Sequence, residues 1–242
     1  MELTGAALVR VPAVLNRQTV RDLRAMLDVA VRDPGPRVTV LIGPGDGIFC
    51  RGMDLAESQS PEGIEEAVRD FAACLEIIRL GPKPVLGLVH GEAIGGGVGL
   101  AAACDGVLAT DDSSFTLSEL LFGLTPAVIL PYLAQRLSAQ RLRWMALTSQ
   151  RVTADQAVQL GLIERTCRVG HAGAILRSWI DRLRRLDHTV VESWKRASAS
   201  PPPPGSPEGT AATLERLGDA GVRERLHRFL ETGEPPWVVP ER

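Results

Sequence analysis

Two glycine-containing segments of this 242-residue chain carry residues whose types and spacing could do chemistry, FCRGMDL at residues 49–55 and HGEAIGGG at residues 90–97. Each places glycine where a strand is expected to stop. Two such turns can direct backbone N–H groups at one oxygen atom, which stabilises the enolate or tetrahedral oxyanion formed from a thioester. The chain is therefore expected to be an enzyme.

The triple glycine at residues 95–97 precedes the apolar run VGLAAA and is predicted to open a helix. The first N–H groups of a helix are unpaired, and its dipole favours negative charge there. We expect Gly96 N–H to be one oxyanion donor and Met53 N–H, in the first turn, to be the other. Taken alone, a triple glycine is more often a tight turn or a close helix–strand contact.

An acid–base group is also needed, and Glu119 is the one charged residue in the apolar run FTLSELLFG at residues 115–123. Burial among apolar groups raises the pKa of a carboxyl, which suits proton exchange near neutral pH. Without the neighbouring motifs, a solvated glutamate on a helix end is an equally good interpretation. Glu92 and Asp54 are weaker candidates, and His90 is expected to hold its loop through a backbone hydrogen bond.

The sequence gives less support for a nucleotide-binding site, a nucleophilic serine or a metal site. The segment GPGDG at residues 43–47 imitates a phosphate-binding loop, but no amphipathic helix begins directly after it and no Lys-Ser/Thr pair follows either glycine cluster. No Ser/His/Asp set or glycine-flanked nucleophilic serine is apparent. The four cysteines form no C-x-x-C pair and no histidine has metal-ligand spacing, so we expect small buried cysteines and no metal.

The composition of the chain argues against two classes of partner, nucleic acids and membranes. A net charge of -2 argues against nucleic acid. No uninterrupted apolar segment approaches the length of a membrane span, and the N-terminus lacks a basic region followed by an apolar run. We therefore expect a cytoplasmic protein with neither a nucleic-acid nor a membrane partner.

The elements that must position these residues follow from local patterns. Short β-branched runs bounded by Pro and Gly predict strands covered on both faces, and apolar residues at three- and four-residue spacing predict helices. The predicted strands are residues 6–11, 37–42, 84–89 and 106–110, and the predicted helices are residues 17–31, 61–80, 129–137, 139–147 and 153–160. Strands that alternate with helices favour parallel pairing through right-handed crossovers. Thr153 and Gln156 form a capping box for the last helix, which Gly161 ends.

A chain of this length can bury one substantial core, so one main α/β domain with a helical tail is expected. We divide the chain into residues 1–165, with the core and the predicted site, and residues 166–242, a helical region with a stiff Pro-rich connection at residues 200–205. Helices beyond this connection need an apolar partner, in the same subunit or a neighbouring one. Their predicted apolar residues are Leu214, Leu217, Val222, Leu226 and Leu230.

In combination, these motifs resemble the crotonase, or enoyl-CoA hydratase/isomerase, superfamily, from the segment PAVLN at residues 12–16 onward. The resemblance implies an α/β crotonase fold, a spiral of β-β-α turns with a helical C-terminal region that mediates trimers and often hexamers. It implies that Met53 and Gly96 supply the oxyanion-hole N–H groups beside the catalytic Glu119. The residues expected to bind substrate are Arg51, Gly52, Gly95, Gly97 and Leu124.

One position departs from the family pattern. Hydratases of this family usually carry two glutamates, one in the helix after the triple glycine and one at the position of Glu119, but the first position is Gly99 here. Hydration of an ordinary enoyl-CoA is thus disfavoured. Reactions that need a single carboxylate, such as double-bond isomerisation, stay open.

A narrower likeness comes from residues 115–124, LPYL at residues 130–133 and the ending ETGEPPW at residues 231–237. These segments are similar to the dehydratases of polyketide β-branching cassettes. The likeness implies dehydration of a 3-hydroxy-3-methylglutaryl thioester to the 3-methylglutaconyl thioester, with decarboxylation left open. The acyl group would be carried on the phosphopantetheine of an acyl carrier protein or on CoA, without a further cofactor.

Basic residues are the candidates for contacts with the carrier protein and the substrate. Arg51 with Arg17 is the candidate patch for an acidic carrier protein, and Lys83 and Arg136 are weak candidates to bind the distal carboxylate of the substrate. An enoyl-CoA isomerase or hydratase acting on CoA thioesters is the enzymatic alternative. A non-catalytic scaffold that binds a carrier protein is the alternative from another class.

Overall fold

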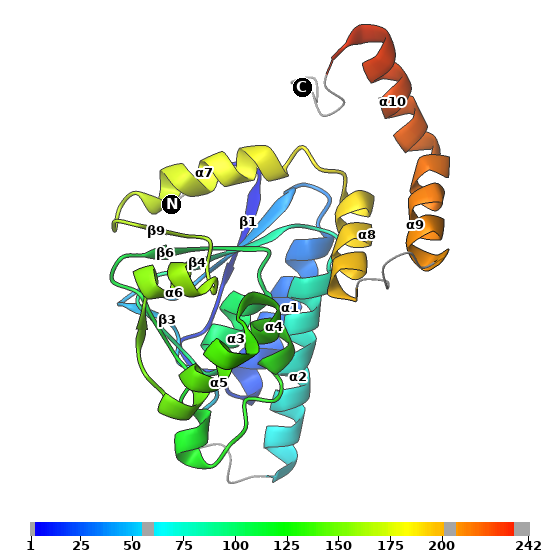
Figure 1. Cartoon of the computed structure of the whole chain (residues 1–242). Coiled ribbons are helices and arrows are strands. Elements are labelled where there is room, and N and C mark those ends of the chain that lie inside the picture. Colours follow the sequence, from blue (N-terminus) through cyan, green and yellow to red (C-terminus); the bar gives the residue numbers. More distant parts are fainter. Residues whose placement is uncertain (1–2, 55–60, 201–206, 235–242) are drawn as a thin grey trace.

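The computed structural model describes residues 3–54, 61–200 and 207–234. At its centre lies a five-stranded parallel sheet in the spatial order β1-β2-β4-β6-β9 (Figure 1). Its strands are β1 (Ala6–Arg10), β2 (Val38–Ile42), β4 (Val85–Val89), β6 (Gly106–Thr110) and β9 (Arg165–Cys167). The three central strands are buried along most of their length, as expected for apolar runs covered on both faces. The predicted strands and their parallel pairing are confirmed.

A second sheet of short strands lies beside the first, in the order β3-β5-β7-β8. Its strands are β3 (Ile48–Cys50), β5 (Glu92–Ile94), β7 (Ser114–Thr116) and β8 (Val152–Thr153), with β8 antiparallel to β7. Each of β3, β5 and β7 directly follows a strand of the main sheet and precedes a helical segment. This repeated order is the spiral of β-β-α turns that the family resemblance implies. Each glycine motif contains the end of a short strand of this second sheet, β3 at Cys50 and β5 at Ile94.

Helices cover the two faces of the main sheet. The helices are α1 (Arg17–Arg32), α2 (Pro61–Leu80), α3 (Gly96–Ala103), α4 (Leu130–Arg136), α5 (Ala139–Thr148), α6 (Ala154–Leu160), α7 (Ala172–Leu183), α8 (His188–Ala199), α9 (Pro207–Gly218) and α10 (Ala220–Thr232), with a 3-10 turn η2 (Glu119–Phe122). Helices α1, α2 and α3 share the larger apolar core on one face, whereas α7 packs against the other face (Figure 1). No helix in the described ranges has both the length and the apolar composition needed to cross a bilayer.

The predicted helix ends are also present. The side chain of Thr153 accepts a hydrogen bond from Gln156 N–H, and the Gln156 side chain accepts one from Thr153 N–H, so the capping box is confirmed. Gly161 ends this helix in the left-handed region, at φ 85°. Asn16 caps α1 in the same reciprocal way with Thr19, a pair that the sequence analysis did not identify.

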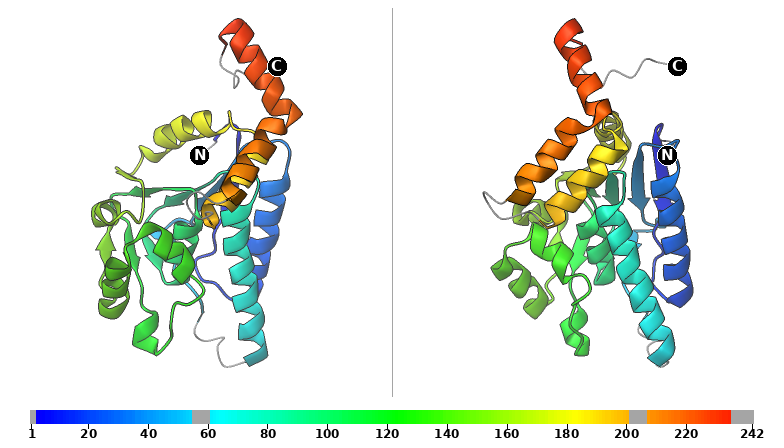
Figure 2. Two further views of the ribbon diagram at one scale, coloured as in Figure 1. Left: turned by 45° about the vertical axis from the view of Figure 1, so that its right-hand side comes forward. Right: turned by 90° about the vertical axis from the view of Figure 1, so that its right-hand side faces the viewer.

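Helices α9 and α10 form an arm that extends away from the rest of the molecule (Figure 2). Neither helix has a buried residue, and Arg225 reaches Asp187, in the cap of α8, at 3.2 Å. The arm exposes large apolar side chains, which are Leu214, Leu217, Leu226, Phe229 and Leu230. The predicted helices are confirmed, while their apolar partner and the division at residue 165 stay predictions. The Pro-rich residues 201–206 and the ending at residues 235–242 lie outside the described residues.

Helix α8 is tied to the body by Lys195, whose buried Nζ donates hydrogen bonds to Ile78 C=O (2.8 Å) and Lys83 C=O (2.9 Å) and lies 2.7 Å from Asp105 Oδ2. Replacing Lys195 by Met removes the cation and leaves Asp105 and two carbonyls without this donor. Because the Asp105 side chain is one-third exposed, we expect a loss of about 2–3 kcal/mol in the free energy of unfolding, measured by urea denaturation.

The neighbouring Arg196 provides the control for this prediction. It is well exposed and pairs with Glu192 one turn away at 2.8 Å, so Arg196→Met should change the free energy of unfolding by about 0.5 kcal/mol or less. Equal losses in the two variants would contradict the anchoring role of Lys195.

Candidate functional site

The two glycine turns meet at the N-terminal end of α3. Gly52 has φ +81°, and a Cβ added to it would lie 2.9 Å from Ile94 C=O and 3.1 Å from Gly96 N. A Cβ at Gly97 would overlap the carbonyl oxygen of Cys50. The main chains after β3 and β5 therefore approach so closely that only glycine fits at these points.

Met53 and Gly96 keep their N–H groups available beside this contact. Leu15 N–H donates to Gly52 C=O and Asp54 N–H donates to Leu15 C=O, both at 2.8 Å, so Met53 lies in a short parallel bridge. Because successive backbone groups alternate in direction, Met53 N–H points away from Leu15. Gly96 N–H belongs to the unpaired first turn of α3. Neither N–H has an acceptor among the residues that the structure describes.

Glu119 is the first residue of η2, and its carboxylate lies at the contact of the two glycine turns. A Cβ added to Gly95 would lie 3.0 Å from Glu119 Oε1 and 3.8 Å from Oε2, so the carboxylate lies directly over Gly95. Oε2 is buried and has no hydrogen-bond partner in the described part of the chain. Burial raises the pKa of Glu119, and hydrogen bonds from the backbone of Glu119 and Ser118 oppose the rise. The predicted direction of this pKa shift is confirmed.

Apolar side chains pack against Gly96. A Cβ at Gly96 would lie 3.0 Å from Leu15 Cδ1 and 3.2 Å from Phe71 Cζ, and both side chains are buried in the core. Apolar walls lower the local dielectric, which strengthens any interaction between the N–H groups and a developing negative charge. Neither Leu15 nor Phe71 is predictable as a site residue from the sequence, because each has the local pattern of an ordinary core residue.

Ile129 occupies the space over Gly99. Gly99 N–H donates to Gly95 C=O at 3.1 Å, so Gly99 lies one helical turn beyond Gly95. A Cβ at Gly99 would overlap Ile129 Cγ2 and lie 2.8 Å from Ile129 Cβ. With Ile129 in place, no side chain fits at position 99, so this packing leaves no room for a second glutamate. Gly99 was a signal of close approach, but the sequence did not identify its partner.

The other predicted binding residues lie farther out. Arg51 is half-exposed and pairs with Glu92, from Nη2 to Oε2 at 3.1 Å. Leu124 is exposed, and its N–H donates to the carbonyl of Glu119 at 3.0 Å. Arg17 pairs with Glu66 on α2. Substrate and carrier binding by Arg51, Leu124 and Arg17 stays a prediction, whereas Gly52, Gly95 and Gly97 do lie at the contact of the two turns.

His90 does not make the expected hydrogen bond. Its Nδ1 is buried without a partner among the described residues, and its Nε2 lies 3.8 Å from Asp112 Oδ2. The prediction that His90 holds its loop through a backbone hydrogen bond is therefore wrong.

Lys83 and Arg136 are also unsuited to bind the substrate. Lys83 is buried and donates to the carbonyls of Ala30 and Asp33. Arg136 lies at the opposite end of α3 from Glu119, where its guanidinium group donates to the carbonyl oxygens of Ala102, Cys104 and Leu162 and to Glu164. Both cations are used to satisfy backbone carbonyls, so they are not free to meet a distal carboxylate.

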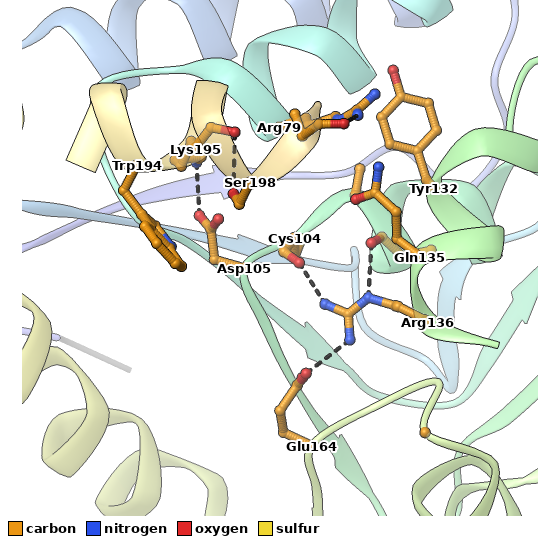
Figure 3. A pocket seen from close by; sticks show the side chains of 14 residues that line it. Arg79, Cys104, Asp105, Tyr132, Gln135, Arg136, Glu164, Trp194, Lys195 and Ser198 are labelled. Carbon is orange, nitrogen blue, oxygen red and sulfur yellow. Dashed lines mark hydrogen bonds and ion pairs between the residues drawn. The ribbon is translucent and has the colours of Figure 1, made fainter. Parts of the chain in front are cut away.

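A cavity of about 370 Å³ lies at this C-terminal end of α3, between α2, α4 and α8 (Figure 3). Arg136 and Lys195 form part of its wall (Figure 3). Arg136 binds the carbonyl of Cys104 and the carboxylate of Glu164, and Lys195 binds the carboxylate of Asp105. Arg136 and Lys195 also donate to backbone carbonyls at the C-terminal ends of α3 and α2. The cavity is separate from the contact of the glycine turns.

The cysteines are structural. All four are buried and free, and burial raises the pKa of Cys50, Cys74 and Cys104 to about 12, so these thiols stay protonated at neutral pH. The prediction of small buried cysteines is confirmed. Within the described ranges, no group of three or more His, Cys, Asp or Glu side chains is placed to hold a metal ion.

Comparison with known proteins agrees with this geometry. The family model for enoyl-CoA hydratase/isomerase matches residues 10–239. The chain is 31% identical over 211 residues to the bacillaene synthase dehydratase PksH of Bacillus subtilis (strain 168), covering 83% of this chain and 80% of that protein. It is 28% identical to the (E)-benzylidenesuccinyl-CoA hydratase of Thauera aromatica, covering 76% of this chain and 73% of that protein.

A solved structure shows the same fold. A Legionella pneumophila protein described as an enoyl-CoA hydratase/isomerase (crotonase) superposes with a TM-score of 0.82 at 25% identity, covering 98% of this chain and 97% of the other. The family match, the identity to named dehydratases and hydratases, and the shared architecture agree with one another. The chain belongs to the enoyl-CoA hydratase/isomerase family and is a crotonase-fold enzyme of the lyase class.

Proposed function

We propose that the chain removes water from a 3-hydroxy-3-methylglutaryl-type thioester on an acyl carrier protein and releases the 3-methylglutaconyl thioester. The observation that carries the proposal is a single desolvated carboxylate, Glu119, with an unpaired oxygen beside the N-terminal end of α3. Ile129 fills the space where a second carboxylate would stand. A site with one carboxylate suits an elimination in which the same group takes a proton and then returns it.

In the first step, Glu119 takes the proton from the carbon α to the thioester. The electrons of that C–H bond form the enolate, whose oxygen accepts hydrogen bonds from Met53 N–H and Gly96 N–H. The positive end of the α3 dipole favours the same negative charge. The raised pKa of Glu119 makes its carboxylate a stronger base than an ordinary glutamate, which brings it closer to the weakly acidic C–H.

In the second step, the enolate electrons form the new C=C bond and the C–OH bond at the β-carbon breaks. Protonated Glu119 gives its proton to the departing hydroxide, so water leaves and the carboxylate is restored. One carboxylate serves both steps because the proton and the hydroxide leave from the same face of the substrate. No cofactor beyond the phosphopantetheine arm enters this balance.

The similarity to a bacillaene synthase dehydratase supports a carrier-bound acyl group and a place in polyketide biosynthesis. The carrier surface would be acidic, and Arg51 and Arg17 are the proposed contacts. Both arginines have carboxylate partners, Glu92 and Glu66, which an acidic carrier would replace. In the proposed homotrimer or hexamer, a second copy would cover the apolar side chains of α9 and α10, which are not buried here.

A second candidate is an isomerase or hydratase that acts on CoA thioesters, since a relative is named for a CoA substrate and Glu119 alone would suffice for isomerisation. The test is intact-mass spectrometry of an acyl carrier protein loaded with 3-hydroxy-3-methylglutaryl and incubated with the enzyme. We expect the loss of one water, and additional loss of carbon dioxide would show that decarboxylation also occurs. An unchanged cognate carrier, together with turnover of the corresponding CoA thioester or of an enoyl-CoA, would contradict the carrier-bound substrate.

A further inference from the structure

The main chain of Leu15 holds the turn that contains Met53. Leu15 N–H donates to Gly52 C=O, and Leu15 C=O accepts from Asp54 N–H, both at 2.8 Å. Gly52 C=O and Met53 N–H belong to one planar trans peptide and point in opposite directions. The hydrogen bond from Leu15 to Gly52 C=O therefore also fixes the direction of Met53 N–H.

The side chain of Leu15 reaches the other glycine turn. A Cβ added to Gly96 would lie 3.0 Å from Leu15 Cδ1. Because a C–C bond is about 1.5 Å long, this methyl carbon lies no more than about 4.5 Å from Gly96 Cα, which is van der Waals contact. The Leu15 side chain is fully buried there. One residue thus contacts both turns, the turn of Met53 through its main chain and the turn of Gly96 through its side chain.

The segment that carries Leu15 is itself held in place. Asn16, the next residue, caps α1 through its reciprocal pair with Thr19. The Thr19 hydroxyl also donates to Val14 C=O at 2.9 Å. These hydrogen bonds fix the main chain on both sides of Leu15, so its side chain is a rigid support for Gly96.

We propose that Leu15 is a positioning residue for the oxyanion hole and sets the separation between Met53 N–H and Gly96 N–H. The inference rests on the proposed function in that these two groups are taken as the donors to the thioester oxygen. Both donors must reach one oxygen at hydrogen-bond distance. Leu15→Ala keeps the main-chain bonds to the first turn but removes the methyl groups that lie against Gly96. The first turn of α3 then relaxes into the vacated space, and the two donors no longer converge.

The first experiment compares crystal structures of Leu15→Ala, Leu23→Ala and the wild type. Leu23 is equally buried in the same core, but its side chain is not among the nearest neighbours of the glycines in the two turns. We expect the separation between Met53 N and Gly96 N to change by about 0.5 Å or more in Leu15→Ala and to be unchanged in Leu23→Ala. If Leu15→Ala does not fold, Leu15→Val should show the same change at smaller size.

Kinetics give the second readout, with 3-hydroxy-3-methylglutaryl on an acyl carrier protein, the same acyl group on CoA, and crotonyl-CoA as probes. Hydrogen bonds to the oxyanion strengthen in the transition state, so kcat should fall about tenfold in Leu15→Ala while KM stays within about twofold. Leu15→Met conserves the volume against Gly96 and should restore kcat to within about twofold of wild type. Leu23→Ala, measured where it is fully folded, should also keep kcat within about twofold.

The crystal structures need no substrate, so they separate the two proposals. An unchanged separation of the two nitrogen atoms in a folded Leu15 variant overturns the role of Leu15 even if the enzyme dehydrates its carrier-bound substrate. Equal losses of kcat in Leu15→Ala and Leu23→Ala overturn it too, because destabilisation alone would then explain the loss. A changed separation supports the role even if the carrier-bound thioester is not processed, in which case the proposed function fails alone.

Discussion

Glu119→Gln is expected to lower kcat for dehydration about 10³-fold while leaving the fold intact. The amide has nearly the same shape as the carboxyl and still fits over Gly95, but it can neither accept the α-proton nor return one to the departing hydroxide. Burial raises the pKa of Glu119 in the folded protein. Its ionised form therefore destabilises the fold when the pH is above the pKa of glutamate in the unfolded chain. The variant should therefore be at least as stable as the wild type at neutral pH, measured by thermal unfolding.

Glu92→Gln is the matched control for this change. Glu92 lies in β5, three residues before Gly95, and pairs with Arg51 at the surface. The substitution makes the same chemical change without altering the proposed acid–base group. Because surface ion pairs contribute little to stability, kcat should stay within about twofold of wild type. Near-normal turnover of Glu119→Gln, or an equal loss in Glu92→Gln, would refute the role given to Glu119.

Gly52→Ala is expected to lower kcat/KM by about 10²-fold, the size of effect seen when one oxyanion donor is lost. The new methyl group would lie 2.9 Å from Ile94 C=O and 3.1 Å from Gly96 N, so the two turns must move apart. Their separation spoils the convergence of Met53 N–H and Gly96 N–H on one oxygen. The measurement is steady-state kinetics on the thioester, with the fold checked by circular dichroism.

Gly170→Ala separates this geometric effect from backbone strain. Gly170 has φ +93°, close to the +81° of Gly52, but a Cβ there meets nothing within 4 Å. Both variants place alanine in the left-handed region, at about 1–2 kcal/mol each. A fall in activity of Gly170→Ala as large as that of Gly52→Ala would mean that destabilisation, and not the contact between the turns, causes the loss.

Local patterns determined most of the architecture of this protein. The β-branched run at Val38–Ile42 has the composition of a strand buried on both faces, and it lies in the middle of the sheet. Thr153 and Gln156 are close enough in sequence to cap their helix by themselves. The family motifs were equally local, since Met53, Gly96 and Glu119 each stand in a short recognisable segment. Information of this kind needs no knowledge of distant residues.

Only the tertiary structure decided which side chains pack against the glycines of the site. Ile129 fills the space over Gly99, and Leu15 and Phe71 pack against Gly96. Lys83 and Arg136 donate to backbone carbonyls elsewhere. Each of these contacts joins residues that are far apart along the chain, and each depends on how closely two elements approach. A buried isoleucine and a helix glycine look the same in sequence whether or not they touch, because packing distance is a property of the folded arrangement and is not encoded in any local pattern.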